Sequence, residues 1–209
     1  MAKNLDKCSL CRRAGEKLFL KGDRCFSPKC AVVRRPYAPG VHGQNMRRGG
    51  SEFGRQLAMK QKIKRIYGIL ERQFRHHFEE SKLREGATGD LLLERLERRL
   101  DNVVYRLGFA NSRNQGRQIV SHKFFTVNGK RMNIPSYEVR VGDIITLKAS
   151  KENKMYVKNQ LEILKNKKDV PHWLTLNAEK LEGTVVARPS REDVGIGVDA
   201  QMVVEYYSK

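Results

Sequence analysis

The sequence has few acidic residues and no apolar run long enough to cross a membrane. Its 209 residues contain 23 Asp and Glu against 42 Lys and Arg, so the formal net charge is +19 at pH 7. So much positive charge repels itself within one fold unless a polyanion offsets it. Nucleic acid is the commonest such partner. We see no signal peptide and no amphipathic Lys-rich tail, and therefore expect a soluble intracellular protein that binds neither a membrane nor a small-molecule substrate.

Cysteine is also scarce, and its four copies all lie within the first thirty residues. They form two close pairs, Cys8/Cys11 and Cys25/Cys30, separated by thirteen residues. Two close thiolate pairs joined by a loop are typical of a four-thiolate metal site. Zinc is the expected ion, and the same ligands would also accept an iron–sulfur cluster. Disulfides are not expected in a chain without a secretory signal.

The cysteine-bearing segment is too polar to build a core of its own. Four thiolates would fill every position around the ion, so the site is predicted to be structural rather than catalytic. Residues 1–50 carry a net charge of +9, and residues 34–50 contain too many Pro and Gly residues for regular structure. We expect the metal to hold this segment together while a basic arm, with one aromatic residue and one His, lies along phosphates.

The middle of the chain is predicted to be helical. Apolar residues recur at three- and four-residue steps from Glu52 to Lys82, and again from Asp90 to Leu107, where Gly108 ends the pattern. Lys and Arg occupy the opposite face of the first helix. Acidic and basic residues mix over 51–98, which is typical of a solvated surface.

Residues 99–150 form a compact basic unit with a net charge of +6. Ser112 and Gln115 have the spacing of a capping box at the start of a short helix. Arg113 and Arg117 lie four residues apart, so they share a helix face and are expected to bind phosphates. Asn128-Gly129 predicts a tight β-hairpin, which would place Lys123, Lys130 and Arg131 near that helix. Val141–Leu147 is predicted to be a buried strand.

The last sixty residues are less basic. We predict a helix over 151–168, core positions around Trp173, a strand over 183–188 and an apolar terminal segment over 203–207. No catalytic constellation is found. An RNA-modifying enzyme that carries a similar module would need a separate catalytic domain, for which no stretch is long enough. A free-standing RNA-binding stress protein would leave the cysteine segment and the last third unexplained.

Several motifs together resemble one family. The set in the central unit closely resembles the small RNA-binding module of the bacterial ribosomal protein S-four family: Ser112-Arg-Asn-Gln, Val127-Asn-Gly-Lys, Pro135-Ser-Tyr and Gly142-Asp-Ile-Ile. The resemblance extends over nearly the whole chain, through the cysteines, the arm from Tyr37 to Gln44, the helix from Lys60 to Arg75, Pro189–Asp193 and Val203–Ser208. It identifies the cysteine-bearing type of the family.

This resemblance implies a structural ribosomal protein and not an enzyme. Family members bind 16S ribosomal RNA early in assembly of the 5′ domain of the cytoplasmic 30S subunit. They lie beside ribosomal proteins S-three and S-five, near the path by which mRNA enters, contribute to translational accuracy, and in some cases repress their own operon. The implied fold is α+β: a metal knuckle and arm over 1–50, a helical part over 51–98 on which 197–209 packs, and a domain over 99–196 whose RNA-binding module spans 99–160.

We predict that RNA contacts come from the arm, the helical middle and the central unit. The predicted residues are Arg12, Arg13, Arg34, Arg35, Tyr37, His42, Arg47, Arg48, Arg55, Gln56, Lys60, Lys62, Lys64, Arg65, Arg72, Arg75, Ser112, Arg113, Gln115, Arg117, Lys123, Lys130 and Arg131.

Overall fold

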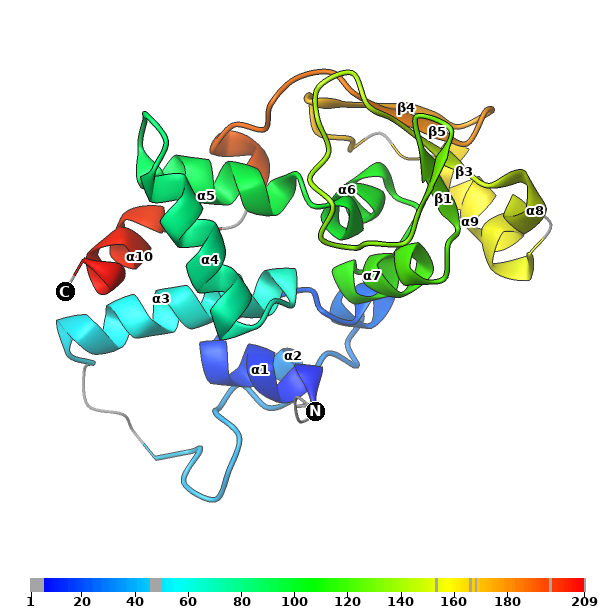
Figure 1. Ribbon diagram of the computed structural model, residues 1–209. Coiled ribbons are helices and arrows are strands. Elements are labelled where there is room, and N and C mark those ends of the chain that lie inside the picture. Colours follow the sequence, from blue (N-terminus) through cyan, green and yellow to red (C-terminus); the bar gives the residue numbers. More distant parts are fainter. Residues whose placement is uncertain are drawn as a thin grey trace. The chain divides into compact units, whose positions relative to one another are not determined.

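The computed structural model describes residues 6–45, 50–152, 154–165, 167, 169–195 and 197–208 (Figure 1). Arg47 and Arg48, both predicted to contact RNA, lie outside these residues. The chain divides into two compact units, residues 1–89 with 197–209 and residues 90–196. The first boundary between these units lies at Gly89/Asp90, and the predicted domain bound at 98/99 stays a prediction. The end of the helix that contains Gly89 is tied to the second unit, since Arg95 pairs with Glu138 at 2.6 Å and Arg98 donates to the carbonyl of Val139 at 2.8 Å.

The first unit is built from helices. They are α1 (Lys7–Ala14), η1 (Gly22–Cys25), α2 (Ala31–Arg34), α3 (Glu52–Tyr67), α4 (Glu71–Lys82) and α10 (Ala200–Tyr207). The side chains of Asp6, Ser51 and Asp199 cap α1, α3 and α10 by accepting a backbone N–H. The single helix predicted over 52–82 is divided, because Gly68 has left-handed dihedrals (φ 63°) and ends α3.

Helix α10 completes the core of the first unit. It packs along α3, as Figure 1 shows. Its Val203 is fully buried, as are Ile63 of α3 and Phe74 of α4. The ring of Tyr207 lies 4.6 Å from that of Phe78, centroid to centroid. The apolar terminal segment thus forms a helix within the first unit, although the whole second unit separates it from α3 in the sequence.

The second unit begins with two helices where one was predicted. Helix α5 (Thr88–Glu97) ends before Arg99, whose extended backbone forms a β-bridge with Glu138, and α6 (Leu100–Leu107) then ends at Gly108 as predicted. The other helices are α7 (Arg113–Ser121), α8 (Ala149–Glu152), α9 (Met155–Lys165) and η2 (Glu192–Val194).

A five-stranded antiparallel sheet completes this unit. Its strands are β1 (Phe125–Val127), β2 (Lys130–Met132), β3 (Ile144–Leu147), β4 (Leu174–Asn177) and β5 (Glu182–Val185), in the order β2-β1-β3-β5-β4. Val127 pairs with Lys130, which confirms the hairpin at Asn128-Gly129. Strand β4 was not predicted, because its Leu174 and Leu176 were read only as core positions.

Helices α6, α7 and α9 pack on the sheet around one apolar core. Leu100, Val104, Val120, Phe125 and Trp173 are among its buried members. The mixed helical and antiparallel fold agrees with the predicted α+β class. None of the described helices combines the length and the apolar character needed to cross a bilayer.

Candidate nucleic-acid interface and cysteine cluster

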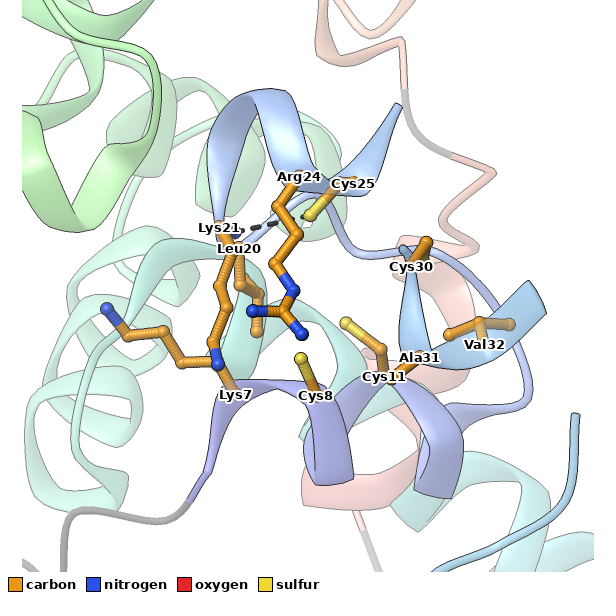
Figure 2. A pocket seen from close by; sticks show the side chains of 10 residues that line it. All are labelled: Lys7, Cys8, Cys11, Leu20, Lys21, Arg24, Cys25, Cys30, Ala31 and Val32. Atoms are coloured by element: carbon orange, nitrogen blue, oxygen red, sulfur yellow. Dashed lines mark hydrogen bonds between the residues drawn. The ribbon is translucent and has the colours of Figure 1, made fainter. Parts of the chain in front are cut away.

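The four cysteines lie on three short elements of the first unit. Cys8 and Cys11 lie on α1, Cys25 ends η1 and Cys30 precedes α2. All four are free and line one small hollow of about 10 Å³. Figure 2 shows the sulfur atoms of Cys8, Cys11 and Cys25 turned toward the same space. The structure therefore brings the four predicted ligands together.

The surroundings of the Cys11 thiol disfavour its thiolate unless a cation lies beside it. Burial raises the pKa of the Cys11 thiol, and the charges of the other three cysteines raise it further. A bound cation would remove that repulsion and favour the thiolates. Lys7, Lys21 and Arg24 line the same hollow, and the backbone N–H of Lys21 donates to Sγ of Cys25 at 3.3 Å. Their charges would offset the excess negative charge of four thiolates on a divalent ion.

Arg12 fixes the start of the arm instead of projecting from it. Its Nε donates to the carbonyls of Tyr37 at 2.9 Å and Arg35 at 3.2 Å, and its guanidinium lies 4.8 Å from the centre of the Tyr37 ring. Arg12 and Tyr37 were both predicted to contact RNA, but here they hold each other. Arg34, Arg35 and His42 are exposed, as a phosphate-binding arm requires.

Three residues predicted to contact RNA from α3 are buried. Gln56, Lys60 and Lys62 are only 2%, 4% and 8% exposed. Gln56 donates to Glu205 at 2.9 Å, Lys60 pairs with Glu71 at 2.7 Å, and Lys62 pairs with Glu16 at 2.8 Å. These partners come from α10, α4 and the segment after α1, which cover α3. These three residues therefore have internal partners in this structure, and their predicted contact with RNA stays a prediction.

The remaining cations of α3 and α4 differ in their pairing. Lys64 pairs with Glu71 at 2.9 Å, and the exposed Arg75 pairs with Glu79 at 2.9 Å. Arg55 and Arg72 are exposed and Arg65 is half-buried. Within the described ranges, Arg55, Arg65 and Arg72 have no carboxylate partner, and the same holds for the exposed Arg13 on α1.

Arg113 in the second unit serves the fold rather than a free basic face. Its Nε donates to Oδ1 of Asn102 at 2.7 Å, and its guanidinium lies 4.7 Å from the centre of the Tyr105 ring. Ser112 caps α7 as predicted, and the Gln115 side chain accepts from the backbone N–H of Asn111 at 2.8 Å. These three predicted contacts are turned inward, whereas the side chain of Arg117 is 43% exposed.

The buried carboxylate that pairs with Arg113 was not predicted. Glu97 is fully buried and accepts from Arg106 at 2.8 and 2.9 Å and from Asn102 at 2.8 Å. Nη2 of Arg113 lies 3.7 Å from Oε1 of the same carboxylate. A buried carboxylate requires such partners, because an unpaired charge in the core is costly. One feature of the sequence could have predicted this ion-pair cluster: a Glu lies on the apolar side of a helix that precedes Arg106 and Arg113.

The hairpin carries the clearest exposed cations of the second unit. Lys130 and Arg131 lie on the edge strand β2, and Lys123 precedes β1 in a left-handed turn (φ 60°). The side chain of Asn128 donates to Asp143 at 2.8 Å and accepts from the N–H of Ile144 at 2.9 Å, which anchors the turn to β3. The structure leaves these three predicted residues open to a ligand.

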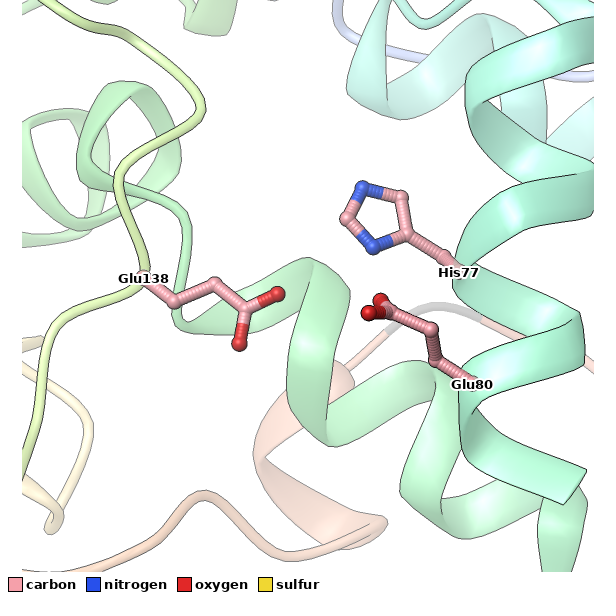
Figure 3. A group of neighbouring side chains, drawn as sticks. All are labelled: His77, Glu80 and Glu138. Carbon is pink, nitrogen blue, oxygen red and sulfur yellow. The ribbon is translucent and has the colours of Figure 1, made fainter. Parts of the chain in front are cut away.

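A second group of possible metal ligands carries no site. Figure 3 draws His77 and Glu80, which lie on α4 of the first unit, and Glu138, which belongs to the second unit. A metal site at these residues would need both units, so we propose none there.

Two family models and several full-length relatives match this chain. The family described as Ribosomal protein S4/S9 N-terminal domain matches residues 4–97, and the S4 domain matches residues 98–145. A protein named small ribosomal subunit protein uS4 from Ruminiclostridium cellulolyticum is 53% identical over the full length of both chains. The chain belongs to the ribosomal protein S4 family. The identically named protein of Thermus thermophilus is 52% identical over 97% of this chain and 96% of its own, and that of Syntrophomonas wolfei is 54% identical over the same shares. The resemblance seen in the sequence is thus confirmed.

Proposed function

We propose that this chain is a structural protein of the small ribosomal subunit that binds ribosomal RNA directly. It acts in the cytoplasmic 30S subunit and is not an enzyme. The observation that carries the proposal is the surplus of exposed cations on both units of a member of the S4 family. RNA phosphates supply the negative charge that balances these cations.

The RNA surface consists of the predicted residues that are exposed and have no carboxylate partner among the described residues, together with Arg117. On the first unit they are Arg13, Arg34, Arg35, His42, Arg55 and Arg72, and on the second unit Lys123, Lys130 and Arg131. The Arg117 side chain is 43% exposed and lies 3.9 Å from Asp101. Arg65 is half-buried and joins the first group. The buried or internally paired residues support this surface by holding its helices in place.

The finer role follows the family. The RNA is the 5′ domain of 16S ribosomal RNA, which the protein binds early in assembly. Its neighbours are ribosomal proteins S-three and S-five, near the path by which mRNA enters, and it contributes to translational accuracy. Repression of its own operon uses the same surface, since its mRNA presents the same phosphates.

Filter binding to an RNA that contains only the 5′ domain tests this function. We expect tight binding that weakens steeply as salt rises, because each neutralised phosphate releases counterions. The control is a structured RNA of equal length and unrelated sequence. Equal affinity for both RNAs would refute specific binding, and failure to sediment with small subunits would refute the ribosomal role.

We propose further that Cys8, Cys11, Cys25 and Cys30 hold one structural zinc ion. Support comes from the four free thiols around one hollow and from the cations beside it. The ion would join α1, η1 and α2, which share few buried apolar residues, and would hold Arg34 and Arg35 in place for RNA. An iron–sulfur cluster on the same ligands is the alternative.

Elemental analysis distinguishes these metals and tests the site. We expect about one zinc per chain, and Cys8→Ala is expected to release it and expose the segment before α3 to proteolysis. Removal of zinc by a chelator is expected to have the same effect on the full-length chain. Iron with matched sulfide would identify the cluster, whereas a purified chain without either metal would refute the site.

A further inference from the structure

A hollow in the first unit lies between α1 and α3. It has a volume of about 610 Å³, which is within the range of small-ligand sites, roughly 300–1,000 Å³. It is distinct from the cysteine cluster, although Arg13 on its rim follows Cys11 on α1. Every residue that lines it belongs to the first unit.

The charge of this hollow is positive and incompletely paired. Its charged lining residues are four cations and one anion, which leaves a net charge of +3: Arg13, Arg55, Lys62, Arg65 and Glu16. Lys62 and Glu16 pair with each other at 2.8 Å, and Lys62 also donates to the carbonyl of Gly197 at 2.6 Å. Among the residues that the structure describes, the three arginines have no carboxylate partner.

Arg13 of α1 and Arg65 of α3 line the same hollow, and their charges repel each other. Burial lowers the pKa of the Arg65 guanidinium, and the nearby charge of Arg13 lowers it further. Two guanidiniums that line one hollow favour a ligand that accepts hydrogen bonds from both, and phosphate is the group whose oxygens match guanidinium donors. Arg55 lies ten residues before Arg65 on α3, about 15 Å along the helix axis, so it would reach a neighbouring phosphate rather than the same one.

The rest of the lining is largely apolar. Ala14, Leu57, Ala58, Met59 and Met202 line the hollow, and the two methionines are half-buried. A flat, polarizable ring packs well on methionine and leucine side chains. Proteins that recognise RNA take up unpaired bases in this way, while arginines hold the adjoining phosphate.

We propose that this hollow binds one unpaired nucleotide of the ribosomal RNA, with its phosphate between Arg13 and Arg65 and its base against the apolar lining. The inference rests on the proposed function and adds a defined nucleotide subsite to it. Arg55 binds the phosphate of an adjacent nucleotide. The Lys62–Glu16 pair closes one side of the hollow and fixes its width.

Matched charge-removal variants of the full chain test this subsite. Arg13→Gln and Arg65→Gln are each expected to weaken binding to the 5′-domain RNA about tenfold. Arg84→Gln is the control, since it removes the same charge from an exposed position of the first unit outside the hollow, and it is expected to change binding less than twofold. Arg65→Lys keeps the charge but loses the forked guanidinium donors, so it is expected to recover only part of the affinity. Thermal unfolding of each variant verifies that it is folded.

Acylation of RNA 2′-hydroxyl groups, which reads every nucleotide, supplies a second readout. In the wild-type complex, we expect protection of at least one unpaired nucleotide. The same nucleotide is expected to become reactive again with the double variant Arg13→Gln/Arg65→Gln, and to stay protected with Arg84→Gln. Leu57→Asp is expected to expose the same nucleotide, because it places a negative charge against the base and phosphate.

The outcomes separate this inference from the proposed function. If wild-type protein shows no preference for the 5′-domain RNA, the proposed function fails. If wild-type protein binds specifically but the Arg13 and Arg65 variants behave like the Arg84 control, only the nucleotide subsite is refuted. Normal RNA binding by those variants with a loss of co-assembly with other small-subunit proteins would assign the hollow to an acidic protein segment, and would also overturn the inference.

Discussion

Lys60 and Arg72 were both predicted to contact RNA, and their surroundings give them different roles. Lys60 is buried, pairs with Glu71 and lies 4.2 Å from the centre of the Tyr206 ring, whereas Arg72 is exposed. A buried ammonium needs a partner, because desolvation is otherwise uncompensated. At the scale of single residues, burial therefore separates cations that stabilise the fold from those that bind phosphate.

The Glu71 cluster predicts how stability depends on pH. Although burial opposes it, hydrogen bonds from Lys60, Lys64 and Tyr207 lower the pKa of Glu71 from 4.5 to about 2. A depressed carboxylate pKa stabilises the fold above the unfolded pKa, and this contribution is lost as the pH falls from about 5 toward 2. Since the Glu71 side chain is 46% exposed, solvent screening limits the contribution to about 1 kcal/mol.

Urea unfolding of Glu71→Gln checks this dependence. The variant is expected to lose about 1 kcal/mol at pH 7 and clearly less at pH 3. Glu79→Gln is the matched control, because Glu79 pairs with Arg75 on the exposed face of α4. An equal loss at both pH values would show that Glu71 acts through packing and not through its charge.

Arg113 and Arg117 allow a second prediction at this scale. The Arg113 side chain is 10% exposed and shares the buried Glu97 with Arg106, whereas the Arg117 side chain is 43% exposed and lies 3.9 Å from Asp101. Arg113→Ala is expected to lower the free energy of unfolding by about 2 kcal/mol, because the buried carboxylate loses a partner. Arg117→Ala is expected to cost less than about 0.5 kcal/mol and to weaken RNA binding instead. Unfolding followed by Trp173 fluorescence measures both, and a stable Arg113→Ala that loses only RNA binding would contradict the assignment.

At the scale of elements, α6 and α7 approach each other closely. A Cβ atom added at Gly116 of α7 would lie 2.5 Å from the carbonyl oxygen of Asp101 in α6. Only glycine therefore lets these helices approach so closely. Their separation positions the hairpin, since α7 leads directly into β1.

Gly116→Ala tests this approach. Alanine favours an isolated helix over glycine by up to about 1 kcal/mol. The clash with rigid backbone outweighs this gain, so we expect a net loss of about 2 kcal/mol. Gln118→Ala on the exposed face of the same helix is expected to be neutral or slightly stabilising. Thermal unfolding measures both, and a stabilised Gly116→Ala would show that the helices can separate without cost.

At the scale of the whole molecule, the chain leaves the first unit at Gly89 and returns to it at Gly197. Helix α10 then contributes Val203 to the core and Glu205, Tyr206 and Tyr207 to the contacts of α3 and α4. The stability of the first unit thus depends on residues that follow the second unit in the sequence. The second unit is continuous in sequence and has its own core.

A stop codon after Val198 tests this dependence in an otherwise intact chain. The truncated protein is expected to lose cooperative unfolding of the first unit, seen as reduced helical circular dichroism. The second unit is expected to remain folded, and Trp173, the only Trp and fully buried in that unit, reports on it by fluorescence. Loss of the native Trp173 emission would show that the two units do not fold independently.

Local signals predicted some elements well. Ser112 and Gly108 mark helix ends, and Asn128-Gly129 marks the hairpin, because caps and tight turns depend on the residue at that position. Gly68 was overlooked as the end of α3, since a continuing apolar pattern masked it. Strand β4 was missed because its pairing with β5 joins two segments that have no strong turn signal.

The sequence alone determined the net charge of +19, the two cysteine pairs, the hairpin and membership of the S4 family, since each depends on composition, spacing or local conformation. Only the tertiary structure decided which cations can reach RNA. Gln56, Lys60 and Lys62 share a helix with Arg55 and Arg65, and nothing in their own segment shows that α10, α4 and Glu16 cover them. Burial is a property of the neighbours that folding brings from elsewhere, and it therefore cannot be read from one helix.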